Sequence, residues 1–278
     1  MILSFAPSSE STPATALAMS FPTLVALLGY ALAALPVERF QPGLRAALVV
    51  GWIGQGAAIV VDVAGLGGNG GGARFGFAPA LSITLWLVIA VYGLESRYVP
   101  MTGMRRRLAL LGCAVVALAW AFPGQPHSPA NPWAPLHWFL GIASYGLFGV
   151  AVLHAVMLNR AERQLRRSPV AAVQPAGGVP LLRLERLTYR FVTGGFVLLS
   201  AAIVLGAWFA SPWRWDHKSV FSLLGWIVVA GLLAGRRAFG WRGPQATRWL
   251  YVGAGLLLLA YVGSRFVFEV LLHRVPSS

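Results

Sequence analysis

The chain has 278 residues, of which 57% are hydrophobic and 11% are charged, and its formal net charge is +14. Soluble domains carry roughly 25% charged residues, so this composition excludes an ordinary soluble domain and indicates an integral membrane protein. Such a positive charge would suggest a nucleic-acid partner in a soluble protein. Here the arginines fall in the connections between apolar stretches, where they set membrane topology, and we expect no nucleic-acid partner.

The sequence holds about eight apolar stretches that are predicted to be transmembrane helices, because an α-helix of about 20 residues spans the hydrocarbon core. The predicted fold class is therefore all-α, a polytopic transmembrane helical bundle that forms a single integral membrane domain over residues 1–278. Residues 160–187 are expected to form a cytoplasmic tether, and residues 208–218 an outward loop rich in tryptophan. The predicted spans are residues 15–36, 44–65, 77–96, 108–123, 135–158, 188–210, 218–235 and 248–272.

Positive charges alternate from one connection to the next. The connections after the first, third, fifth and seventh spans hold 17 of the 22 Lys and Arg residues, and the other loops with the last helix and tail hold five. Cytoplasmic loops are the ones that carry excess Lys and Arg. Both termini and the 208–218 loop are therefore predicted to face outward, into the periplasm of a bacterium. The predicted location is the bacterial inner (cytoplasmic) membrane.

Few catalytic patterns are present in the sequence. Cys113 is the only cysteine, so an internal disulfide, a CxxC redox pair and a CxxCH site for covalent haem attachment are all excluded. No nucleophile–base pair, zinc signature or nucleotide-binding loop is visible. We therefore do not expect a self-contained catalyst.

Aromatic and titratable residues gather at the predicted outer face. His137 and His273 lie at the outer ends of the fifth and eighth spans, and the tryptophan-rich loop lies between them in sequence. Haem would suit this set, because its iron accepts neutral imidazole nitrogens on both axial faces. Its ring can stack on indoles, and its propionates can pair with Arg or Lys. The residues that the 208–218 loop contributes are Trp208, Trp213, Arg214, Trp215, Asp216, His217 and Lys218.

Alternatives remain open for several of these residues. Trp and Tyr gather at membrane interfaces in any case, so the tryptophans could form an ordinary aromatic belt. Asp216 alternatively caps the seventh helix, and His217 is a third ligand, a propionate donor or a helix-start residue. His154 lies 17 residues after His137, roughly 25 Å along a helix, and is predicted to lie near the cytoplasmic end. Asp62 is a weaker functional candidate near the outer end of the second span.

Two segments resemble a known family. The run from Gly206 to Phe221, with Trp213-Arg214-Trp215-Asp216 at its centre, resembles the tryptophan-rich "WWD" region of the cytochrome c assembly proteins. That group includes the haem-handling membrane proteins CcsA/ResC, CcmC and CcmF. The helix start from Trp133 to Tyr145 is similar to the segment of CcsA that carries its first periplasmic haem-ligating histidine. The length and the Asp-His-Lys variant most resemble the short HemX/YpjD-like branch.

The resemblance implies a membrane protein that binds non-covalent haem b in cytochrome c assembly. His137 and His273 would be the axial ligands of the iron, with Trp208, Trp213, Trp215 and Asp216 as the platform. The implied partners are the lipid bilayer, haem, an apocytochrome c and other assembly subunits. The long form of the family relays haem across the bilayer through transmembrane histidines, but the first four spans here contain none, so we expect no such relay. The alternative function is a transport or transport-accessory subunit that keeps the fold without haem chemistry.

Overall fold

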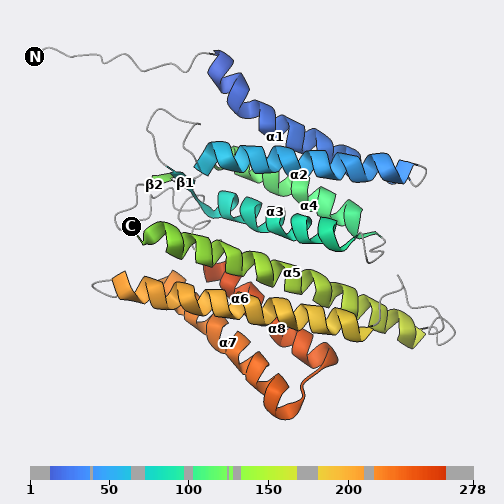
Figure 1. The fold of residues 1–278 in the computed structure, drawn as a ribbon, viewed down its shortest axis with the longest axis vertical. Coiled ribbons are helices and arrows are strands. Elements are labelled where there is room, and N and C mark those ends of the chain that lie inside the picture. Colours follow the sequence, from blue (N-terminus) through green and yellow to red (C-terminus); the bar gives the residue numbers. More distant parts are fainter. Residues whose placement is uncertain are drawn as a thin grey trace, which may run out of the picture.

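The computed structural model describes residues 13–37, 40–63, 73–96, 103–123, 125–127, 133–167, 181–209 and 216–260 (Figure 1). The regular secondary structure of this part of the chain is helical apart from two three-residue strands, so the predicted all-α helical bundle is confirmed. The helices are α1 (Pro13–Ala33), α2 (Gln41–Val63), α3 (Phe77–Glu95), α4 (Met104–Ala121), α5 (Ala134–Arg167), α6 (Leu181–Phe209), α7 (His217–Phe239) and α8 (Gly243–Leu258). The strands are β1 (Ala73–Phe75) and β2 (Gln125–His127).

Five of these helices are long and apolar enough to cross a membrane, so the protein is a multi-pass membrane protein. These are α2, α3, α5, α6 and α7. Three arginines in the first turn of α4 make that helix less apolar. The described apolar part of α1, Ser20–Ala33, and the 16-residue α8 are short. The described part of the chain therefore has the predicted number of about eight helices, and the predicted number of spans is approximate.

Successive helices run in alternating directions (Figure 1). One end of the bundle, which we call the strand end, gathers β1, β2, the starts of α3, α5 and α7, and the ends of α2, α4, α6 and α8. The opposite end, the arginine end, carries basic residues such as Arg45, Arg105, Arg186 and Arg236. All described segments that were predicted to face outward thus meet at the strand end.

Two predicted connections are partly helical. α5 continues to Arg167 and α6 begins at Leu181, so only residues 168–180 of the expected 160–187 tether lie outside the described helices. Arginines in the last turns of α5 favour this extension, because cations stabilise the negative end of a helix dipole. Similarly, α6 reaches Phe209 and α7 starts at His217. Trp208, His217 and Lys218 therefore belong to helices and not to a loop.

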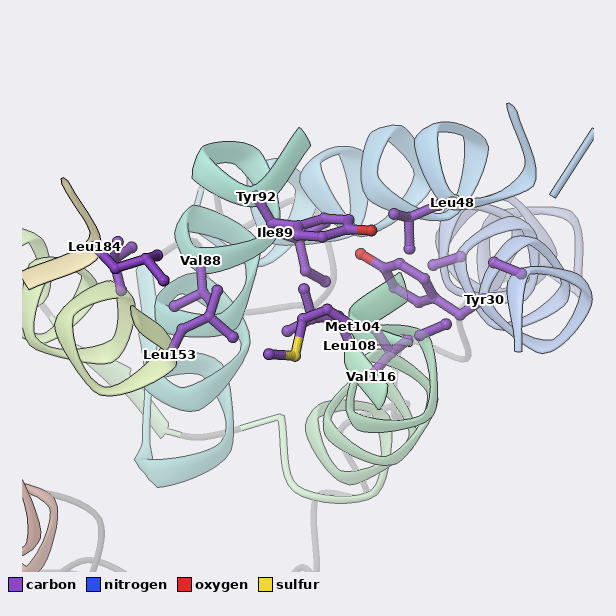
Figure 2. Close-up of a cluster of buried hydrophobic side chains, with 14 of the residues drawn as sticks. Tyr30, Leu48, Val88, Ile89, Tyr92, Met104, Leu108, Val116, Leu153 and Leu184 are labelled. Atoms are coloured by element: carbon purple, nitrogen blue, oxygen red, sulfur yellow. The ribbon is translucent and has the colours of Figure 1, made fainter. Parts of the chain in front are cut away.

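The buried hydrophobic side chains form two cores, one for each half of the chain. The first core joins α1–α4 to parts of α5 and α6 and contains Tyr30, Ile89 and Leu108 (Figure 2). Glycines let α1 and α2 approach closely in this half, as small residues do between membrane helices. A Cβ added to Gly29 would lie 2.4 Å from the backbone nitrogen of Gly51. The second core joins α5, α6, α7 and α8.

The short strands add a contact that the sequence did not predict. β1 and β2 pair antiparallel, with Ala73 opposite His127 and Arg74 opposite Pro126. They join the connection between α2 and α3 to the connection between α4 and α5. Both segments were expected to be plain loops, because three residues are too few to show the alternation that identifies a strand.

Candidate haem-binding site at the strand end

Five of the nine predicted site residues lie in the described part of the chain, and all five lie at the strand end. Trp213, Arg214, Trp215 and His273 are outside the described residues. The five are His137 in the first turn of α5, Trp208 in the last turn of α6, and Asp216, His217 and Lys218 at the start of α7.

The imidazole of His137 is held against α6. Its Nδ1 lies 2.9 Å from the carbonyl oxygen of Ala202, at hydrogen-bond distance. A carbonyl oxygen can only accept a hydrogen bond, so Nδ1 carries a proton in this contact. In the neutral ring, Nε2 is then the nitrogen with the lone pair, which is the form that binds a metal. A second group that fixes the other ring nitrogen is typical of metal-ligating histidines.

Gly206 provides the space in which this ring lies. A Cβ at position 206 would come within 2.9 Å of Cε1 and 3.2 Å of Nδ1 of His137. Real Cβ atoms essentially never approach a neighbour below 3.0 Å, so a side chain at 206 would displace the ring. The glycine of the Gly206-Ala207-Trp208 segment is therefore a steric requirement of the His137 position.

Two further predicted residues lie at the same end of the bundle as His137. The charge of Lys218, in the first turn of α7, acts electrostatically on the His137 ring. Trp208 lies one turn or less beyond Gly206 on α6 and is 86% exposed. The end of α6 thus presents a large indole surface and α7 presents a cation, which are the two kinds of group that a haem face and a propionate need.

Asp216 is the N-cap of α7. One of its carboxylate oxygens accepts a hydrogen bond of 2.7 Å from the backbone N–H of Ser219. Partial burial opposes ionisation of this group, but the hydrogen bonds from Ser219 and the charge of Lys218 outweigh it, and the pKa of the carboxyl is lowered below its ordinary value. The capping role that the sequence left open is therefore present, and it fixes the direction in which α7 leaves the 208–218 segment.

Replacing Asp216 with alanine should destabilise the protein by about 1 kcal/mol, the usual cost of losing an N-cap, whereas Asp216→Ser should keep most of the stability. The folded-state pKa of Asp216 is depressed, so its contribution is fully present above its unfolded-state pKa of about 3.9 and disappears as the pH falls through the lower folded-state value. Thermal unfolding of the two variants at neutral and acidic pH measures this. An Asp216→Ala loss that persisted unchanged at low pH would contradict it.

A second histidine contact lies far from His137 along α5. His154 is fully buried, and its Nε2 lies 2.6 Å from a carboxylate oxygen of Glu95 at the end of α3. Its Nδ1 lies 2.8 Å from the carbonyl oxygen of Val150, and its ring stacks on Phe191. The sequence predicted that His154 lies near the cytoplasmic end but did not pair it with Glu95. Their common depth in adjacent spans was the available signal.

The described residues contain no group of three or more His, Cys, Asp or Glu side chains that could hold a metal ion. A haem iron does not need such a group, since it takes its equatorial ligands from the macrocycle and its axial ligands from two side chains. Of the two predicted axial ligands, His137 has the hydrogen bond and the packing that suit this role.

These features define a class of protein, a multi-pass helical membrane protein with a candidate ligand site at one end of its bundle. The site combines an oriented histidine, an exposed indole and a capped helix start. Residues 71–272 match the family described as Cytochrome C assembly protein. Because the match covers more than half of the chain, the protein belongs to the cytochrome c assembly protein family.

Several relatives agree with this family. A 28.8 kDa protein of Azospirillum brasilense is 28% identical over 81% of this chain and 85% of its own length. Inner membrane protein YpjD of Escherichia coli K12 is 32% identical over 56% of this chain and 60% of its own length. Cytochrome c biogenesis protein CcsA of Synechococcus sp. CC9902 is 31% identical over 55% of this chain and 60% of its own length.

The match thus covers less than two thirds of YpjD and of CcsA. The similarity to YpjD agrees with the predicted short branch of the family. No solved structure matches the chain.

Proposed function

We propose that this protein acts in cytochrome c assembly in the bacterial inner membrane, where it holds non-covalent haem b at its strand end. The observation that carries the proposal is the hydrogen bond between Nδ1 of His137 and the carbonyl of Ala202. It fixes the tautomer and the orientation of an imidazole at the end of the bundle that also holds the tryptophan-rich segment. These are the requirements of an axial haem ligand.

The proposed site is built from three helices and two segments outside the described residues. His137 and His273 would hold the haem iron, each through an imidazole nitrogen. Bound haem supplies an iron centre and a flat apolar ring, and it is the cargo of the site. Trp208 and the Trp213–Trp215 segment cover the ring, while Lys218 and Arg214 pair with its propionates. Asp216 sets the start of α7 and thereby the position of Lys218.

The proposed orientation places the strand end on the periplasmic side. The support is the uneven distribution of Lys and Arg, of which 17 of 22 lie in the connections assigned to the opposite side. Cytoplasmic connections are the ones enriched in these residues. In that orientation the haem faces the compartment in which an apocytochrome c and further assembly subunits would receive it.

The test is an absorbance spectrum of the detergent-purified protein from haem-replete cells, oxidised and reduced. We expect a Soret band in the wild type, loss of that band in His137→Ala and His273→Ala, and retention of the band in His217→Ala. Thermal unfolding of each variant serves as the control for folding. A folded wild-type protein without haem absorbance would refute the haem site and favour the transport alternative. Loss of the band in a folded His217→Ala variant would show that His217 contributes to haem binding, as a ligand or as a propionate donor.

A further inference from the structure

A cavity of about 210 Å³ lies among α1, α2, α3 and α4 at the strand end. It is separate from the candidate haem site, because its lining comes from the first half of the chain and from β1, and includes no residue of α5, α6 or α7. Ligand pockets for drug-sized molecules measure roughly 300–1,000 Å³, so this cavity suits a smaller molecule and excludes haem. Its polar lining residues are Ser20, Thr23, Gln55, Asp62, Arg74 and Ser82.

Two opposite charges line the cavity without neutralising each other in a close ion pair. Asp62 comes from the end of α2, and Arg74 from β1, where pairing with Pro126 positions its backbone. Their charges attract each other, but the ion pairs of the described residues involve Glu95 and Glu185 and none joins Asp62 to Arg74. A carboxylate this close to the membrane is costly unless it is paired or wet. The cavity thus offers one acidic and one basic contact to a ligand between them.

The deeper wall of the cavity is polar and rigid. Gln55 is 1% exposed, and its oxygen accepts a hydrogen bond of 2.5 Å from the hydroxyl of Tyr30. Its amide nitrogen donates to the backbone oxygen and to the hydroxyl oxygen of Ser82, both at 3.0 Å. Such a satisfied network holds its members in place. The lining also includes Trp120, whose side chain is 67% exposed.

We propose that this cavity binds a small zwitterion that carries an ammonium group and an oxyanion, with the chemistry of phosphoethanolamine. The ammonium donates to the carboxylate of Asp62, and the phosphate oxygens accept from the guanidinium of Arg74, whose fork matches oxyanions. The indole of Trp120 covers the short methylene link and adds a cation–π contact. Two sources can supply this chemistry: a free solute, or the headgroup of a phosphatidylethanolamine molecule in the surrounding leaflet.

The first experiment titrates the full-length protein, in a detergent free of phosphatidylethanolamine, with O-phosphoethanolamine by isothermal titration calorimetry. We expect binding in the wild type that becomes at least tenfold weaker in Asp62→Asn and in Arg74→Gln. The matched controls are Glu162→Gln and Arg248→Gln, which remove the same charges at the arginine end. They should bind as the wild type does.

The second experiment reconstitutes the same variants in nanodiscs of phosphatidylethanolamine or of phosphatidylcholine and measures retained lipid by native mass spectrometry. Retention of phosphatidylethanolamine that is lost in Asp62→Asn and Arg74→Gln identifies the lipid headgroup as the ligand, even if the free solute does not bind. Equal retention in all variants, together with no binding of free O-phosphoethanolamine, overturns the proposal. Thermal unfolding confirms that the variants fold, and His137→Ala should bind the zwitterion normally, which separates this site from the haem site.

Discussion

For the proposed haem site, replacing Gly206 with valine is expected to remove the haem absorbance, although His137 itself is unchanged. A Cβ at this position would lie 2.9 Å from Cε1 of His137, and valine adds two methyl groups to it. The ring must then leave α6, which breaks the hydrogen bond of Nδ1 to the carbonyl of Ala202. We expect haem affinity to fall at least tenfold, or about 1.4 kcal/mol, as measured by haem titration at the Soret band.

Gly141→Val is the matched control for this experiment. Gly141 lies one turn after His137 on α5, and a Cβ there would meet nothing within 4 Å. The control variant carries the same helix-propensity change from glycine to valine but no collision with the ring. Haem affinity that falls equally in Gly206→Val and Gly141→Val would mean that the position of His137 does not control binding.

Replacing Glu95 with alanine should be among the most destabilising single changes at the arginine end. It leaves Nε2 of the fully buried His154 without the carboxylate that lies 2.6 Å away. Stranding a buried polar group costs about 1–3 kcal/mol, and breaking a buried charged pair about 3–5 kcal/mol. We expect a loss within this span in chemical or thermal unfolding, while the Soret band of the protein that remains folded is unchanged.

The double variant Glu95→Met with His154→Phe is the control for this prediction, because it removes both polar partners at once. Replacing both partners with apolar side chains of similar size can be nearly neutral, and a phenylalanine at 154 keeps the stacking on Phe191. The double variant should therefore be more stable than Glu95→Met alone. A loss of stability in the double variant that equals the sum of the losses in Glu95→Met and His154→Phe would contradict a direct coupling between Glu95 and His154.

The helices were predictable because their signal is spread over some twenty residues. The spans expected at 77–96 and 44–65 correspond to α3 at Phe77–Glu95 and α2 at Gln41–Val63. The boundaries that shifted are those where polar residues continue a helix beyond the apolar core, as at Arg167 and at His217. Apolar periodicity alone carries no information about such extensions.

The candidate site was predictable in its residues but not in its contacts. His137 was identified from its place at a helix start and from the family resemblance, whereas its partner, the carbonyl of Ala202, belongs to a backbone and leaves no mark in the sequence. The same is true of Gly206, whose role depends on how closely α6 approaches α5. The pairing of Glu95 with His154 also required the relative rotation of α3 and α5, which composition and spacing do not contain.

Helix α5 contributes to both buried clusters of the protein. Val150 and Leu153 face the core shared with α1–α4, and Phe148 and Ala151 face the core shared with α6–α8. In evolutionary terms the two halves are therefore not separable modules, although each has its own core. A shortened relative that lacked α1–α4 would expose an apolar face of the same helix that carries His137. Packing against α5 thus gives the first half of this chain a structural role, although its first four helices contain no histidine.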